Sequence, residues 1–178
     1  MNEQMKNTTV PATNALTMLV DKAGDNLRAV IFFGSHLVNS TPGQHSAADW
    51  FVIVNDYRAF YRAVSAWLGY PAILVAWLNR LLPPNVIHIP VAGEAGIKAA
   101  VISEKDFARA MGARAKDHFC KGRLVQKVDV IHARDPEIGE WVHERLLDAR
   151  MGTLDWVPLY ADGKFTVESY CLAMMKTS

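Results

Sequence analysis

The sequence has little cysteine and no excess of either charge. Only two of its 178 residues are cysteines, Cys120 and Cys171, and they lie fifty-one positions apart. They form neither a CxxC pair nor a zinc-ligand spacing, so the chain is not a disulfide scaffold. Lys plus Arg number 19 and Asp plus Glu number 18, a formal net charge of +1. This balance gives no overall attraction to nucleic acid or to an anionic membrane, so any attraction to phosphate must come from a local site, and we expect no nucleic-acid partner.

The first residues lack the features of a targeting segment. Residues 1–13, MNEQMKNTTVPAT, have neither the basic-then-apolar order of a signal peptide nor the Arg-rich, acid-poor composition of a transit peptide. We predict a disordered polar leader there and a cytoplasmic protein.

One apolar segment approaches the length of a membrane span. Residues 63–79, AVSAWLGYPAILVAWLN, carry no charge, but Gly69, Tyr70 and Pro71 interrupt them. A Gly-to-Pro break of this kind favours two short helices over one span. Core packing explains such helices most simply, and a surface that contacts acyl chains or a membrane is the alternative.

The remaining pattern predicts an α/β fold. With 51% apolar residues, the chain is long enough for one good-sized core. Four short apolar runs are typical of strands, at residues 28–33, 49–54, 86–91 and 97–102. Amphipathic stretches between them predict flanking helices. We expect a mixed-sheet α/β domain over residues 14–102 and a mostly helical C-terminal subdomain over 103–178.

The pattern that predicts chemistry is a Gly-Ser pair followed by an acidic residue. The first apolar run ends at Gly34 and Ser35, and thirteen residues separate Ser35 from Asp49, which opens the second run. Glycine permits a tight turn in which backbone N–H groups approach a phosphate, and serine adds a hydroxyl donor. A carboxylate beside that turn can hold a divalent cation against the phosphate.

This arrangement resembles the signature of the nucleotidyltransferase superfamily, which usually has Asp-x-Asp at the second strand. Here Phe51 stands at the second position. Three blocks resemble a narrower family, the mitochondrial-type phosphatidate cytidylyltransferases. Residues 49–56 are similar to its Asp-Phe-Val-x-x-Val-Asp-Asp segment, with Asn55 as a departure. Residues 97–103 are similar to its Ile-Lys-Tyr-Gly-Val-Ile-Ser strand, and residues 119–124 to its Tyr-Ile-Ala-Gly-Arg-Leu.

The resemblance implies an activity, a metal and a set of site residues. The family transfers a cytidylyl group from CTP to phosphatidic acid with Mg²⁺, and it works at the inner face of a membrane as a peripheral protein. By this likeness Asp49 and Lys98 are catalytic, and Asp49 and Asp56 are metal ligands. The nucleotide-binding residues are Gly34, Ser35, Lys98 and Arg123. The family continues beyond the last predicted helix, so we expect a shortened C-terminal subdomain.

Four of these residues also have a purely structural explanation. Asp49 fits the start of a strand without any chemistry, although a carboxylate beside Trp50 and Phe51 is costly without a partner. Asp56 fits a helix N-cap, Lys98 fits a strand-edge residue that reaches solvent, and Arg123 fits a helix C-terminus.

Two other functions remain open at this stage. One is a nucleotidyltransferase that acts on a soluble small molecule or a protein hydroxyl. The other is a non-catalytic scaffold that binds nucleotide, which the replacement of the second aspartate by Phe51 favours.

Overall fold

The structure is a computed structural model that describes residues 13–38, 47–91, 95–112, 115, 118–160 and 163–177. The predicted leader, apart from residue 13, lies outside the described residues. The second half of the loop between Ser35 and Asp49, residues 39–46, lies outside them as well.

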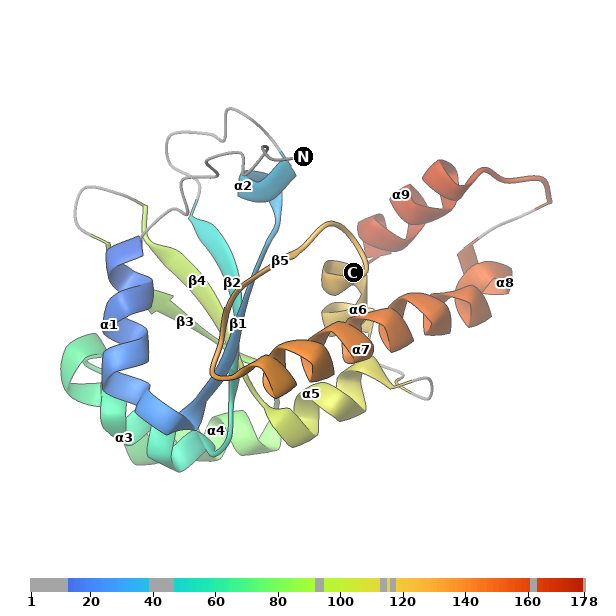
Figure 1. The fold of residues 1–178 in the computed structure, drawn as a ribbon. Helices are drawn as coiled ribbons and strands as arrows, with labels where there is room; N and C mark the ends of the chain where they lie inside the picture. The colour runs from blue at the N-terminus through green and yellow to red at the C-terminus, as the bar shows by residue number, and fades with distance from the viewer. Residues whose placement is uncertain are drawn as a thin grey trace, which may run out of the picture.

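Five strands form one mixed sheet (Figure 1). They are β1 (Leu27–Phe33), β2 (Ala48–Val54), β3 (Asn85–Ile89), β4 (Ile97–Ser103) and β5 (Asp129–Ala133), in the order β3-β4-β2-β1-β5. The pair β2 and β4 is parallel, and all other neighbours are antiparallel. The predicted α/β class, with a mixed sheet and flanking helices, is confirmed.

Helices cover both faces of the sheet. The first face packs against α1 (Thr13–Ala23), α3 (Tyr57–Leu68) and α4 (Ala72–Leu81). The second face packs against α5 (Glu104–Met111), α6 (His118–Leu124) and α7 (Pro136–Gly152). The shorter elements are η1 (Gly24–Asn26), α2 (Ser35–Val38), η2 (Thr153–Trp156), α8 (Val157–Tyr160) and the final α9 (Val167–Thr177).

Alternation along β2 separates the two cores. Trp50, Val52 and Val54 lie in the cluster on the first face, whereas Phe51 and Ile53 lie in the cluster on the second. A strand buried on both faces reads as a continuous apolar run, which is the pattern of this segment. Asp49 therefore points to the same side as Phe51 and Ile53, toward the second face.

The uncharged segment 63–79 forms parts of two helices, as predicted. α3 ends at Gly69, which adopts a left-handed conformation with φ of 73°, and Pro71 precedes α4. Among the described residues, no helix is both long and apolar enough to cross a membrane.

A buried amide ties α4 to the sheet and gives a stability prediction. The Tyr61 hydroxyl donates to Asn79 Oδ1 at 2.6 Å, and Asn79 Nδ2 donates to the Val101 carbonyl at 3.0 Å. Asn79→Ala removes one of two partners of the buried Tyr61 hydroxyl, which also bonds to Asn85, and the side-chain donor to the Val101 carbonyl, so we expect the free energy of unfolding to fall by about 1–2 kcal/mol. Urea denaturation measures this loss. An Asn79→Leu, Tyr61→Phe double variant should recover part of it, and an unchanged midpoint for Asn79→Ala would contradict the role of the amide.

Candidate functional site

The backbone at Gly34 lies directly against the Asp49 carboxylate. In the antiparallel register of β1 and β2, Phe33 pairs with Asp49, and Gly34 follows with φ of 88°. A Cβ atom placed on Gly34 would lie 2.7 Å from Asp49 Oδ2. This approach and this left-handed conformation both require glycine. The predicted turn and the predicted carboxylate are therefore in contact.

Lys98 lies across the other edge of β2. It pairs with Asp49 in the parallel register of β2 and β4, and it is exposed. Within β4, Ala100 and Ile102 belong to the second core cluster, so Lys98 shares their side of the sheet and points to the same face as Asp49. The strand register places the acid and the cation side by side.

The electrostatics of Asp49 show which further residues lie near it. Burial raises the pKa of the Asp49 carboxyl, while the positive charges of Lys98, Arg123 and His36 counteract that rise. Arg123 comes from α6 on the second face and His36 from α2, immediately after the Gly34 turn. Four elements thus direct polar groups to one end of the sheet.

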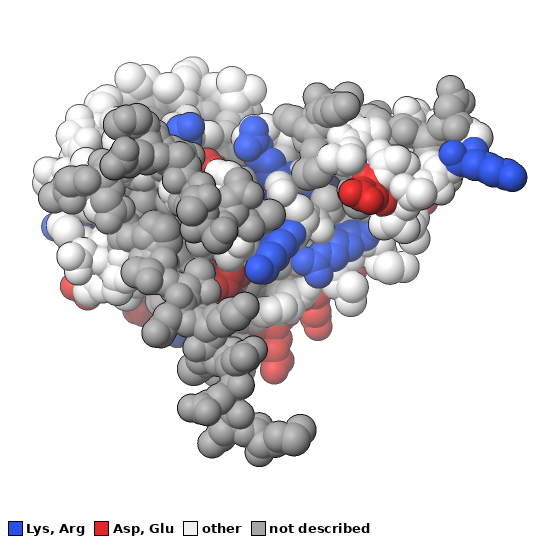
Figure 2. Space-filling view, turned by 90° about the horizontal axis from the view of Figure 1, so that it is seen from above, with Lys and Arg blue, Asp and Glu red and all other residues white. Residues whose placement is uncertain are grey.

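Arg123 is held by an aromatic ring. Its guanidinium carbon lies 4.6 Å from the centre of the Phe119 ring, and its Nε atom is buried without a hydrogen bond to the described residues. Figure 2 looks down on this end of the molecule and shows Lys and Arg side chains around the middle of the face. An unsatisfied guanidinium beside a carboxylate suits an anionic ligand such as a phosphate.

Lys121 on α6 is a buried cation that the sequence did not single out. The side chain is fully buried, Nζ has no hydrogen-bond partner among the described residues, and it lies 5.4 Å from the centre of a Trp156 ring. Burial lowers the pKa of its ammonium group. In the sequence, only its position in the 119–124 block, two residues before Arg123, could have indicated a functional role for Lys121.

Asp56 lies beyond the opposite end of β2 from Asp49. Its carboxylate caps α3 and accepts a hydrogen bond from the Ala59 N–H at 2.8 Å. Seven residues of extended strand span roughly 20 Å, whereas Mg²⁺ ligands lie about 2 Å from the ion. The two carboxylates cannot share one ion, which corrects the prediction of Asp56 as a second ligand.

The residues present fit Mg²⁺ only together with a phosphate ligand. Within the described ranges, no group of three or more His, Cys, Asp or Glu residues could hold a metal ion. Asp49 is the one carboxylate that the described residues place against the Gly34 turn, and Phe51, where a second aspartate would stand, packs with its ring centre 5.2 Å from that of Phe33 in the core. Mg²⁺ commonly binds through one or two carboxylates plus substrate phosphates. Asp49 would hold it, and the nucleotide would complete the coordination.

No family model and no curated protein matches the chain. The resemblance to the cytidylyltransferases therefore rests on the three blocks of sequence alone.

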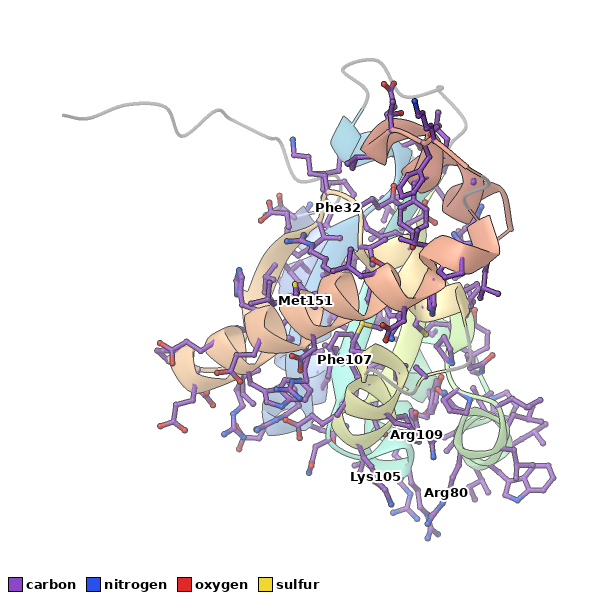
Figure 3. All side chains as sticks on the ribbon, turned by 90° about the vertical axis from the view of Figure 1, so that its right-hand side faces the viewer. Phe32, Arg80, Lys105, Phe107, Arg109 and Met151 are labelled. Atoms are coloured by element: carbon purple, nitrogen blue, oxygen red, sulfur yellow. The ribbon has the colours of Figure 1, made fainter. Side chains whose placement is uncertain are left out.

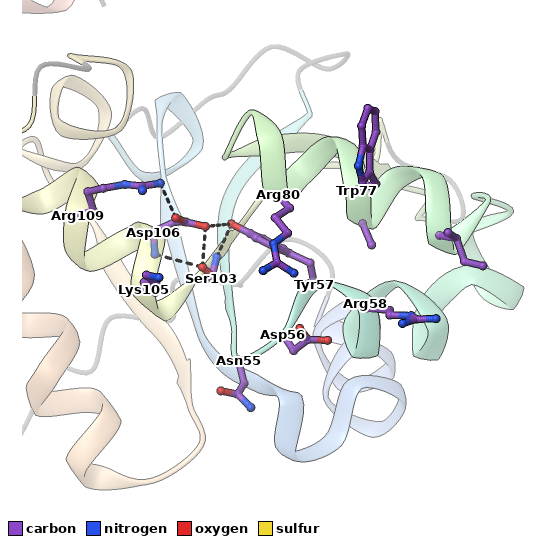
Figure 4. Close-up of a pocket in the computed structure, with 12 residues that line it drawn as sticks. Asn55, Asp56, Tyr57, Arg58, Trp77, Arg80, Ser103, Lys105, Asp106 and Arg109 are labelled. Carbon is purple, nitrogen blue, oxygen red and sulfur yellow. Dashed lines mark hydrogen bonds and ion pairs between the residues drawn. The ribbon is translucent and has the colours of Figure 1, made fainter.

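A second polar site lies at the opposite end of the sheet. A cavity of about 620 Å³ is bounded by the start of α3, the end of α4 and the start of α5 (Figure 4). At its back the Asp106 carboxylate receives the hydroxyls of Tyr57 and Ser103, both at 2.8 Å, and pairs with Arg109 at 2.5 Å. Burial raises the pKa of Tyr57. Residues from four elements make this cavity, so no local pattern in the sequence indicates it.

Proposed function

We propose that the chain transfers a cytidylyl group from CTP to phosphatidic acid and releases pyrophosphate. One observation carries the proposal: the Gly34 turn and three charged side chains, Asp49, Lys98 and Arg123, converge at one end of a mixed sheet. A phosphate-binding turn, a carboxylate for a divalent ion and two cations are the parts that nucleotidyl transfer needs. The choice of CTP and of a lipid acceptor comes from the three family-like blocks.

The reaction is an in-line displacement at phosphorus. A phosphate oxygen of phosphatidic acid forms a bond to the α-phosphorus of CTP, and the bond from that phosphorus to the bridging oxygen of pyrophosphate breaks. The attacking oxygen is already ionised, so the chain needs no strong base. Positioning and neutralisation of charge lower the barrier.

The chain's own residues would divide this work. Gly34 and Ser35 bind the triphosphate through backbone N–H groups and a hydroxyl. Lys98 offers a point charge and Arg123 a two-pronged donor to phosphate oxygens. Asp49 holds Mg²⁺, which when bound neutralises phosphate charge.

The direct test is an assay of the purified chain with CTP, Mg²⁺ and phosphatidic acid in detergent. We expect CDP-diacylglycerol and pyrophosphate in equal amounts, with little product from ATP or GTP. Equal use of CTP and ATP would contradict the choice of nucleotide. Pyrophosphate release that does not depend on the lipid would favour a soluble acceptor.

The single carboxylate that the described residues bring to this site favours a second candidate, a scaffold that binds nucleotide without turnover. Phe51 fills the core where superfamily enzymes usually have their second aspartate. Binding of CTP that depends on Mg²⁺, with no product from any acceptor, would support this candidate over the transferase.

Lys98 gives a prediction for nucleotide binding. Lys98→Met keeps the length of the side chain and removes its charge, and because Lys98 is exposed the fold should not change. Loss of one charge-assisted contact should weaken binding of CTP with Mg²⁺ about tenfold or more. Isothermal titration calorimetry measures the affinity. Lys22→Met, at an equally exposed lysine on α1, is the matched control and should bind as the wild type does. Equal affinities for both variants would remove Lys98 from the site.

A further inference from the structure

The helix α4 presents an apolar face that no described residue covers. We call this surface the α4 outer face; it consists of Ile73, Leu74, Trp77, Leu78, Leu81 and the adjoining Leu82. The five helical positions are spaced one, three or four residues apart, so they lie on one side of the helix. Ile73 is 69% exposed, Trp77 58% and Leu82 76%. A contiguous apolar surface of this kind marks an interaction site.

The opposite face of α4 already packs on the sheet. Val75 and Ala76 lie in the first core cluster, and Asn79 makes the buried contacts described above. A helix that is apolar on both sides is normally buried. In α4, only Arg80 is charged. The outer face is therefore not the polar side expected of a surface helix.

Cations surround the cavity beside this face. Arg58 from α3, Arg80 from α4, and Lys105 and Arg109 from α5 all line it, together with Ile73 and Trp77 of the outer face (Figure 4). In Figure 3, Arg80, Lys105 and Arg109 lie at the same lower end of the molecule.

The acidic residues of this cavity are already engaged. Asp106 pairs with Arg109, and Asp56 caps α3. Within the described part of the chain, Arg58, Arg80 and Lys105 make no ion pair. The lining residues of the cavity carry four positive and two negative charges, so a net positive charge lies next to an apolar helix.

We propose that the α4 outer face and this cavity dock the protein on an anionic phospholipid bilayer. Leucine and isoleucine side chains would enter the acyl region and Trp77 would lie at the headgroup level, where tryptophan is enriched. Arg58, Arg80 and Lys105 would contact lipid phosphates. A second copy of the chain fits less well, because a two-fold contact would bring the same cations against one another.

A second pair of exposed apolar residues, on α7, resembles Trp77 and Leu81 of α4 but differs in the charges around it. On α7, Leu147 is 58% exposed and Met151 60%, close to Trp77 at 58% and Leu81 at 56%. Both pairs are four residues apart on a helix. The α7 pair, however, lies among two acids, Glu144 and Asp148, and two arginines, Arg145 and Arg150, whose charges cancel. An anionic bilayer attracts the surroundings of the α4 pair and not those of the α7 pair.

The docked lipid is an anchor and not the substrate. The cavity lies at the end of β2 that Asp56 follows, whereas Asp49 lies at the other end, roughly 20 Å away along the strand. Docking through α4 holds the candidate transfer site away from that bilayer, so a phosphatidic acid acceptor would have to reach Asp49 from outside the docked membrane.

Vesicle flotation without nucleotide tests the docking. We expect the wild-type chain to float with equimolar phosphatidylcholine and phosphatidylglycerol vesicles, and added NaCl to release it. Pure phosphatidylcholine should bind much less. The double variant Trp77→Gln, Leu81→Gln should bind at least about tenfold more weakly, since two apolar anchors are lost. Its matched control, Leu147→Gln with Met151→Gln, should bind as the wild type does.

A charge variant tests the cavity separately. Arg80→Gln with Lys105→Gln should also weaken flotation, and the residual binding should depend less on NaCl than that of the wild type. Thermal melting checks that each variant folds. Because the substituted positions are exposed, we expect the variants to keep the wild-type fold.

Three outcomes would overturn the proposal. The first is a wild-type chain that does not float, and the second is equal binding by both apolar double variants. The third is a dimer, seen by light scattering, that only the α4 variant dissociates, which would assign the face to a second copy. Because flotation uses no CTP, its result is independent of the transfer assay: flotation without transfer would reject the proposed function and keep the docking surface.

Discussion

Replacement of Asp49 by asparagine should abolish transfer and leave the protein folded. Asparagine keeps the shape of the side chain but removes the charge that would hold Mg²⁺ against the triphosphate, so we expect a loss of about 10³-fold or more. Burial already raises the pKa of the Asp49 carboxyl, which means that the ionised form is disfavoured by its surroundings. Removal of the charge should therefore not lower the melting temperature. Product formation at saturating Mg²⁺ and a thermal melt measure the two effects.

Asp56→Asn is the matched control for this prediction. Asparagine caps helices as well as aspartate does, so α3 should remain intact. The control should keep most of its activity, because Asp56 lies beyond the far end of the same strand. An active Asp49→Asn variant and an inactive Asp56→Asn variant would reverse the assignment of the site.

The substitution Gly34→Ala should damage the site through a single methyl group. Its Cβ would lie 2.7 Å from Asp49 Oδ2, and φ of 88° disfavours any side chain. The Asp49 carboxylate must shift to make room for the methyl group, and a displacement of about 1 Å at a reacting centre can lower the rate about 10²-fold. The left-handed backbone should add a stability loss of about 1–2 kcal/mol. Steady-state transfer rates and urea denaturation separate the two losses.

Gly69→Ala separates the backbone cost from the contact with the carboxylate. Gly69 has φ of 73°, close to that of Gly34, but nothing lies within 4 Å of a Cβ placed there. This control should lose similar stability and keep its transfer rate. If both variants lose the same fraction of activity, the contact between Gly34 and Asp49 is not part of the site.

Local patterns in the sequence were sufficient to predict the strands β1 and β2 and the break between α3 and α4. The apolar runs 28–33 and 49–54 correspond to β1 and β2 within one residue at each end. The break between α3 and α4 follows from Gly69 and Pro71, which disfavour a continuing helix whatever surrounds them.

Contacts between distant segments could not be predicted in the same way. The pairing of Asp49 with Lys98 depends on a parallel register between strands 49 residues apart, and no local pattern sets that register. The approach of Arg123 depends on how α6 packs on the second face. The strand β5, Asp129–Ala133, lies at the edge of the sheet beside β1, a position that a short, half-buried strand does not reveal.

The two faces of the sheet are covered by helices from different parts of the chain. A fragment that stops at residue 102 would keep β1 to β4, but it would lack α5, α6 and α7. Phe51, Ile53 and Ile102 would then face water, and β1 would lose its neighbour β5. A bare apolar face with an open edge is a template for aggregation. The protein should therefore unfold in a single cooperative transition, with no stable half that survives cleavage between Ile102 and Ser103.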